Sequence, residues 1–123
     1  MLKIILCRLA AEYLYGVKVM YYTYILRCEK GTLYTGITTD VQRRFQEHLS
    51  KTGVGAKYTR ANSPVEIVSV WASSDRSKAT KLECFIKTLT KSQKLELISS
   101  PDVTLKKYSH KINVEDYILQ KIK

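Results

Sequence analysis

Two tyrosines, Tyr24 and Tyr34, stand ten residues apart, and Gly36 follows the second one. Both lie in runs rich in aromatic and β-branched residues, YYTYILRC and TLYTGIT, separated by Glu29-Lys30-Gly31. Paired as a hairpin with a three-residue loop, these runs would place Tyr24 opposite Gly36, with the tyrosines as diagonal neighbours roughly 7–8 Å apart on one face. Two phenols beside an open notch could bind one group by hydrogen bonds, although nine tyrosines in one chain also produce such pairs by chance.

Arg44 and His48 stand four residues apart, which places them on the same side of a helix. We expect them to flank the apolar stripe of that helix and to point sideways along the sheet. An arginine there can bind two phosphate oxygens and stabilise the negative charge that grows during displacement at phosphorus. The alternative is an exposed basic helix edge with Glu47 nearby, which by position is the better interpretation for Arg43.

Glu83 lies at the margin of the apolar face of a second expected helix. Its carboxylate could hold a single Mg²⁺ or Mn²⁺, hard cations that take oxygen ligands and often keep most of their waters. A lone glutamate among lysines is more often a solvated ion-pair partner. The residue taken alone therefore leaves a metal site and an ion pair both open.

The elements that would position these residues follow from periodicity and caps. Thr39 and Gln42 form a capping box, and an i, i+4 stripe of Val41, Phe45 and Leu49 predicts a helix that ends at Gly53. The run VEIVSVW after Pro64 predicts a third strand, and further helices are expected from Ser73, from the Thr90–Gln93 capping box to Pro101, and around VEDYILQKI. The fold class is α+β, a small three-stranded antiparallel sheet flanked by helices.

Three segments are expected along the chain. Residues 1–20 form an N-terminal extension, with Met20 as a possible alternative start; residues 21–100 form the domain, and residues 101–123 a basic, helical tail. Within the domain the loop GVGAKYTRANSP carries Lys57, Tyr58 and Arg60, which suit contact with phosphates or bases.

The charge balance favours an anionic partner. Twenty-one Lys and Arg against eleven Asp and Glu give a net charge of +10 in 123 residues, which points to nucleic acid first and an acidic membrane surface second. Three cysteines without a C-x-x-C pair argue against a zinc or redox motif and suit the cytoplasm. The first apolar run stops at Arg8, which argues against a signal peptide or a membrane span.

The combination of these motifs resembles the GIY-YIG nuclease domain. The triplets YTY (22–24) and YTG (34–36), the spacing from Asp40 to Arg44, and His48 are similar to the small stand-alone bacterial members, over about residues 21–99. The first triplet lacks the leading glycine, and no asparagine follows Glu83 before Asn113. The family fold is a small domain with a three-stranded antiparallel sheet.

The resemblance implies a role for each matching residue. It identifies five catalytic residues, Tyr24, Tyr34, Arg44, His48 and Glu83, and makes Glu83 also the ligand of one Mg²⁺ or Mn²⁺. The chain is then expected to be a metal-dependent endonuclease that hydrolyses phosphodiester bonds of DNA, branched or single-stranded, in repair, recombination or processing. Arg43 and the basic loop would bind nucleic acid, and no membrane or small-molecule cofactor is implied. The alternative is a non-catalytic nucleic-acid-binding module or adaptor that keeps the fold.

Overall fold

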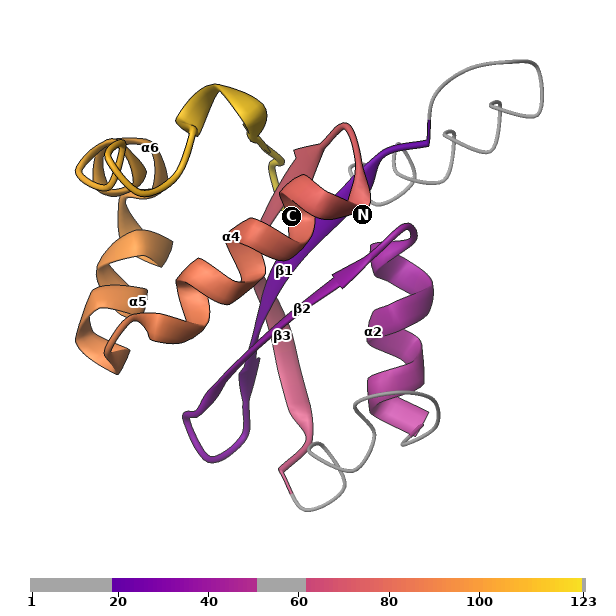
Figure 1. Ribbon diagram of the computed structural model, residues 1–123. Coiled ribbons are helices and arrows are strands. Elements are labelled where there is room, and N and C mark those ends of the chain that lie inside the picture. Colours follow the sequence, from indigo (N-terminus) through magenta and orange to yellow (C-terminus); the bar gives the residue numbers. More distant parts are fainter. Residues whose placement is uncertain (1–18, 51–61, 123) are drawn as a thin grey trace.

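An antiparallel sheet with helices on both faces forms the centre of the computed structural model, which describes residues 19–50 and 62–122 (Figure 1). The sheet has the strand order β2-β1-β3-β4. Its strands are β1 (Tyr21–Cys28), β2 (Leu33–Thr38), β3 (Pro64–Ser73) and β4 (Ile118–Leu119), and the helices are α2 (Val41–Ser50), α4 (Arg76–Thr88), α5 (Lys91–Ser99) and α6 (Pro101–Lys106). The α+β class is confirmed, and the two-residue β4 adds a fourth strand to the three expected.

The β1–β2 hairpin has the predicted three-residue loop. The amide of Cys28 donates to the carbonyl of Thr32 at 2.9 Å, and Gly31 takes a φ of 81°, which L side chains rarely adopt. This loop fixes the register, so Tyr24 lies opposite Gly36 and Leu26 lies opposite Tyr34, as expected.

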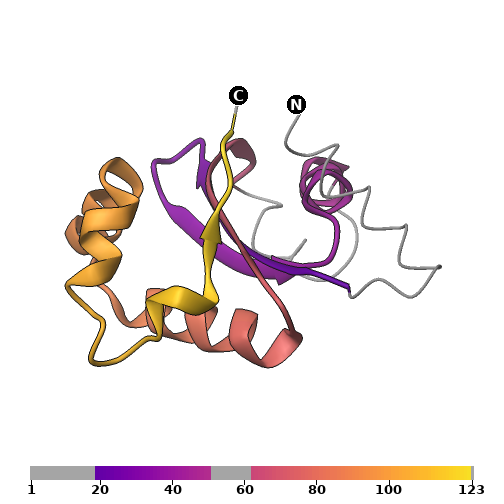
Figure 2. The ribbon, with the colours of Figure 1, turned by 90° about the horizontal axis from the view of Figure 1, so that it is seen from above.

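Alternate residues of β1 build two separate cores, one on each face of the sheet. Tyr22, Tyr24 and Leu26 pack with Val41 of α2. On the other face Ile25 packs with apolar residues of α4 and of the chain beyond it. Figure 2 shows α2 on one side of the sheet and α4, α5 and α6 on the other.

The start and the buried face of α2 both differ from the prediction. Asp40, not Thr39, caps the helix, because its Oδ1 accepts the amide of Arg43 at 3.1 Å. Leu49 is 41% exposed, whereas Arg44 and His48 are buried against the sheet. The expectation that these two polar residues point sideways is therefore wrong: they replace Leu49 on the packed face. The expected end of this helix at Gly53 lies outside the described residues.

The C-terminal helix expected around VEDYILQKI is absent from the described residues. This segment forms a 3₁₀ turn, η2 (Val114–Asp116), and then β4, while a helix not predicted from the sequence, α6, begins at Pro101. The free edge of β3 explains the difference, because Ile118 and Leu119 pair with Ala72 and Trp71 there.

The segment from α6 to Tyr117 belongs to the same core as the helices before it. Leu105, Ile112 and Tyr117 are buried with Leu82 and Ile86 of α4. Within the described residues, no helix has both the length and the apolar character that crossing a membrane requires. Of the N-terminal extension, residues 1–18 lie outside the described residues.

Candidate active site

A cleft of about 400 Å³ opens where the edge strand β2 meets α2 and α4. We call it the tyrosine cleft; its lining comes from β1, β2, α2 and α4 and consists of Tyr24, Tyr34, Gly36, Ile37, Arg44, Arg76, Thr80 and Glu83. Four of the five residues predicted to be catalytic are in this lining. They come from segments far apart in sequence, so the fold brings them together.

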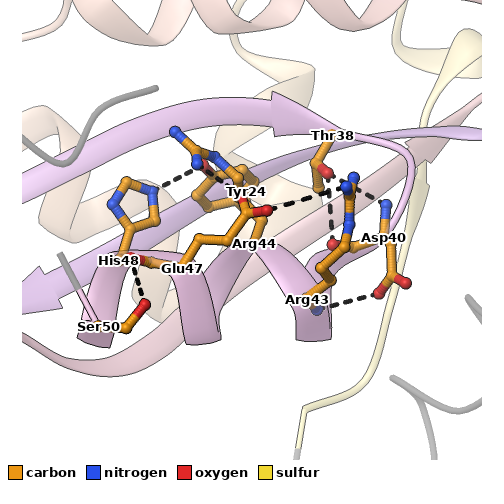
Figure 3. Close-up of polar contacts among 8 residues, drawn as sticks. All are labelled: Tyr24, Thr38, Asp40, Arg43, Arg44, Glu47, His48 and Ser50. Atoms are coloured by element: carbon orange, nitrogen blue, oxygen red, sulfur yellow. Dashed lines mark hydrogen bonds and ion pairs between the residues drawn. The ribbon is translucent and has the colours of Figure 1, made fainter. Parts of the chain in front are cut away.

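Tyr24 connects the cleft to the buried core beside α2. Its side chain is 1% exposed, and its hydroxyl lies 3.1 Å from Nε2 of His48 (Figure 3). Burial raises the pKa of Tyr24, the neighbouring Tyr34 adds to the rise, and the nearby Arg44 guanidinium opposes it. The phenol is therefore protonated at neutral pH. It can accept a proton only if it gives its own proton to a neighbouring group at the same time.

Gly36 leaves the space through which Tyr24 reaches the edge of the sheet. A Cβ on Gly36 would lie 2.5 Å from the Tyr24 hydroxyl oxygen and 2.7 Å from its Cζ. Because Tyr24 lies opposite Gly36 in the register, its ring crosses β2 at the position that has no side chain. The glycine notch proposed from the sequence thus holds the tyrosine itself.

His48 lies behind the cleft and does not line it. It is fully buried, and its ring centroid lies 4.8 Å from that of Tyr34 in an edge-to-face contact. Burial first, and the positive charge of Arg44 second, lower the pKa of His48 to about 4. The imidazole is neutral at pH 7 and can accept a proton from Tyr24, depending on the tautomer.

Arg44 brings a positive charge to the cleft. The residue is 9% exposed, and its Nη1 lies 2.8 Å from Oε1 of Glu47 (Figure 3). Burial alone would lower the pKa of Arg44, but the hydrogen bond with Glu47 and the nearby tyrosines give a net rise. Glu47 holds the guanidinium in place, and the same contact lowers the pKa of Glu47.

Glu83 reaches the cleft from α4, the helix on the other face of the sheet. Its side chain is 18% exposed, and Oε2 lies 3.3 Å from Nζ of the exposed Lys87. Exposed pairs of this kind are weak, so a cation could displace Lys87. The described residues contain no group of three His, Cys, Asp or Glu, and the cleft offers only oxygen donors, from Glu83, Thr80 and the tyrosines. This donor set fits Mg²⁺ or Mn²⁺ holding mostly water and does not suit zinc.

Of the four residues predicted to contact nucleic acid, only Arg43 lies within the described residues. Arg43 is exposed, 3.8 Å from Glu47, and lines a neighbouring hollow, not the tyrosine cleft. Lys57, Tyr58 and Arg60 lie outside the described residues.

Two residues of the cleft, Arg76 and Thr80, are not predicted from the sequence. They precede Glu83 by seven and three positions, so the three form one stripe along α4. With Glu83 as a candidate metal ligand, this spacing identifies Arg76 and Thr80 as its neighbours on the same face of the helix.

Comparison with known proteins gives consistent matches. A family model described as the GIY-YIG catalytic domain matches residues 20–96. The chain is 41% identical over 95 residues to the UPF0213 protein CPE1444 of Clostridium perfringens, covering 77% of this chain and 100% of the relative. It is 45% identical to the UPF0213 protein FN1575 of Fusobacterium nucleatum, covering 70% and 84%. A solution NMR structure of the UPF0213 protein BH0048 from Bacillus halodurans is 44% identical, covers 65% of this chain and 83% of that one, and has a TM-score of 0.43.

The family match extends over more than half of the chain and includes every residue that lines the tyrosine cleft. The names of these relatives state no reaction, so the chemistry rests on the family and on the site. The chain belongs to the GIY-YIG catalytic domain family, a family of nucleases.

Proposed function

We propose that this protein is a metal-dependent endonuclease that hydrolyses phosphodiester bonds of DNA. The observation that carries the proposal is the tyrosine cleft, in which two phenols, an arginine and a carboxylate from three layers of the fold face one space of about 400 Å³. A base, a cation for phosphate and a ligand for a divalent ion are the groups that such hydrolysis needs.

Tyr24 takes the proton of the attacking water. The water oxygen bonds to phosphorus, its proton passes to the Tyr24 oxygen, and the phenolic proton passes to Nε2 of His48, 3.1 Å away. This transfer avoids a free tyrosinate but places a positive charge on His48. After the bond to the leaving oxygen has broken, His48 returns this proton through Tyr24 to solvent. Burial disfavours both charged forms, so the imidazolium lasts only until the proton returns. His48 acts only through Tyr24, because it is fully buried and does not line the cleft.

Arg44 and Tyr34 bind the phosphate as its charge grows. The Arg44 guanidinium, fixed by Glu47, donates to non-bridging oxygens, and the half-buried Tyr34 orients the phosphate beside the water. The bond between phosphorus and the 3′ oxygen breaks, and that oxygen takes a proton from solvent. The products are a 5′-phosphate and a 3′-hydroxyl.

Glu83 would hold the divalent ion. When bound, Mg²⁺ or Mn²⁺ supplies charge that stabilises the leaving oxygen. The Glu83 carboxylate would exchange its contact with the exposed Lys87 for the ion. We expect branched or single-stranded DNA as the substrate, and a role in DNA repair, recombination or processing in the cytoplasm.

A cleavage assay tests the proposal. Single-stranded, flapped and branched DNA are incubated with Mg²⁺ or Mn²⁺ and the wild type, Tyr24→Phe, Arg44→Ala or Glu83→Gln. Each substitution is expected to lower the cleavage rate at least about 100-fold, because each removes a base, a charge or a metal ligand. Tyr108→Phe, which removes a phenol outside the cleft, should retain the wild-type rate.

Activity that survives Arg44→Ala and Glu83→Gln would reject the site. DNA binding without cleavage under every metal condition would favour the alternative, a non-catalytic module or adaptor. Circular dichroism of each variant shows that a lost rate does not reflect a lost fold.

A further inference from the structure

A second concave surface lies on the outer side of α4, away from the sheet. We call it the outer groove; it measures about 720 Å³ and is lined by Arg76, Ser77, Thr80, Lys81, Cys84, Phe85, Lys111, Ile112, Asn113, Asp116 and Tyr117. Residues 107–122, which we call the C-terminal segment, run beside α4 in Figures 1 and 2. Five of them, between Lys111 and Tyr117, line the groove opposite α4 as its second wall. Tyr117 fastens that wall, since its hydroxyl donates to the carbonyl of Lys78 at 2.7 Å.

The groove carries uncompensated positive charge. Arg76, Lys81 and Lys111 are exposed, and none of the three side chains forms an ion pair among the described residues. The carboxylate of the lining, Asp116, lies 3.5 Å from Nζ of Lys78, which offsets part of its charge, so the three cations of the groove outweigh it. An anion entering the groove would meet cations that no protein carboxylate has satisfied.

The floor of the groove is apolar and partly aromatic. Phe85 is half-buried and its ring is held by an edge-to-face contact with Tyr108, with centroids 5.0 Å apart. Ile112 and Tyr117 are buried beside it. A rigid aromatic face surrounded by lysines suits a nucleobase with its phosphate, and the volume suits a ligand of that size.

Arg76 joins the groove to the tyrosine cleft. It lines the outer groove, the tyrosine cleft and a third hollow of about 400 Å³ that also contains Arg43 and Arg44. Thr80 is shared by the first two. Along α4, residues 76, 80 and 83 face the cleft, and residues 77, 81 and 84 face the groove. A strand bound at the cleft would therefore continue into the groove past Arg76 and Thr80, which line both.

We propose that the outer groove binds the single-stranded nucleotides next to the scissile phosphate, with Arg76 on the phosphate between the two sites. Lys81 and Lys111 bind the flanking phosphates, and Phe85 stacks on a base. The wall formed by the C-terminal segment favours a single strand over a duplex, because only a splayed base can reach Phe85. The inference rests on the proposed DNA-binding function of the same face, but its test does not require cleavage.

The first experiment measures binding of a short single-stranded oligonucleotide by fluorescence anisotropy in EDTA, where no cleavage occurs. Lys81→Ala/Lys111→Ala should weaken binding at least about tenfold and reduce the slope of log K against log salt by about 1.4, the loss of two phosphate contacts. Phe85→Leu, which keeps the apolar volume, should weaken binding at least about fivefold. The matched control Lys94→Ala/Lys106→Ala removes the same charge outside the three hollows and should change affinity less than about threefold.

The second experiment uses Cys84 as a reporter inside the groove. Cys84 is exposed and Cys28 is buried, so in a Cys7→Ser background alkylation should report on Cys84. The oligonucleotide should slow this alkylation at least about fivefold, and a blunt duplex of equal length should not.

Equal losses in the two lysine pairs, or no protection of Cys84, would overturn the inference, and equal protection by the duplex would overturn the choice of a single strand. The two proposals can fail separately: Cys84 protection without cleavage under any condition contradicts only the nuclease, whereas cleavage with an unprotected Cys84 contradicts only the groove.

Discussion

Burial sets the protonation states of the two residues that share a hydrogen bond behind the cleft. Tyr24 is held neutral because its pKa is raised, and His48 is held neutral because its pKa is lowered to about 4. In the tautomer that leaves Nε2 unprotonated, the neutral Tyr24 hydroxyl donates a hydrogen bond to the neutral His48 ring. The same arrangement makes the stability of the fold depend on pH.

The lowered pKa of His48 predicts a loss of stability in acid. Above about pH 6.5 the imidazole is neutral in both the folded and unfolded states, so it adds no pH dependence. Between about pH 6.5 and about pH 4 only the unfolded chain binds the proton, and the free energy of unfolding should fall by on the order of 3 kcal/mol, about 2 of it by pH 5. Urea unfolding at about pH 7.5 and pH 5 measures this loss.

His48→Gln is the control for that measurement. The variant lacks the titrating group, so its stability should change less between the two pH values than that of the wild type. An equal change in both proteins would show that His48 titrates normally.

Gly36 and Gly31 offer a matched pair of glycine substitutions. A Cβ on Gly36 would lie 2.5 Å from the Tyr24 hydroxyl, so Gly36→Ala should displace Tyr24, destabilise the fold by about 1–3 kcal/mol and abolish cleavage. A Cβ on Gly31 would lie 3.7 Å from Nζ of Lys91, and only its φ of 81° opposes alanine. Gly31→Ala should therefore cost about 1–2 kcal/mol while cleavage persists. Unfolding curves and cleavage rates test both; equal activity in the two variants would contradict the role of the notch.

At the scale of the elements, two helices on opposite faces of the sheet supply the cleft from both sides. α2 contributes Arg44, and α4 contributes Arg76, Thr80 and Glu83. Edge strand β2 lies between them and has no side chain at Gly36, and residues of both helices line the tyrosine cleft at that edge. The residues at which α2 and α4 begin therefore set where their side chains enter the cleft.

The N-caps of these helices should contribute measurably to stability. Oδ1 of Asp40 accepts the amide of Arg43 at 3.1 Å, and Oδ1 of Asp75 accepts the amide of Lys78 at 2.8 Å. Asp40→Ala and Asp75→Ala should each lower the free energy of unfolding by about 1 kcal/mol, whereas the Asn variants, which keep an acceptor oxygen, should lie within about 0.5 kcal/mol of the wild type. Urea denaturation compares the four variants. A loss in the Asn variants equal to that in the Ala variants would point to charge, not capping.

At the scale of the whole molecule, the net charge of +10 predicts steep salt dependence of DNA binding. Each phosphate neutralised on a single strand contributes about −0.7 to the slope of log K against log salt, and four or more contacts should give a slope of about −3 or steeper. Anisotropy titrations over a range of KCl concentrations measure it. An affinity that does not change with salt concentration would contradict the prediction, made from the net charge, that the partner is nucleic acid.

Local features of the sequence determined the parts of this protein that depend on neighbours in the chain. Glu29-Lys30-Gly31 set the hairpin register and with it the pairing of Tyr24 with Gly36, because a loop with one left-handed residue allows few alignments. The Thr90–Gln93 capping box formed as expected, since its hydrogen bonds span one helical turn. The two tyrosine triplets, the spacing from Asp40 to Arg44 and His48 were enough to indicate the family.

Contacts in the tertiary structure decided which residues are buried and which segments form strands, where the local sequence permitted more than one outcome. His48 is buried and Leu49 is exposed because the tyrosines of the sheet offer His48 a hydrogen bond and ring contacts. Residues 118 and 119 form a strand because β3 has a free edge, and Arg76 joins three hollows because α4 begins where β2, α2 and the C-terminal segment converge. These outcomes depend on contacts between residues distant in the chain, which periodicity and capping rules do not describe.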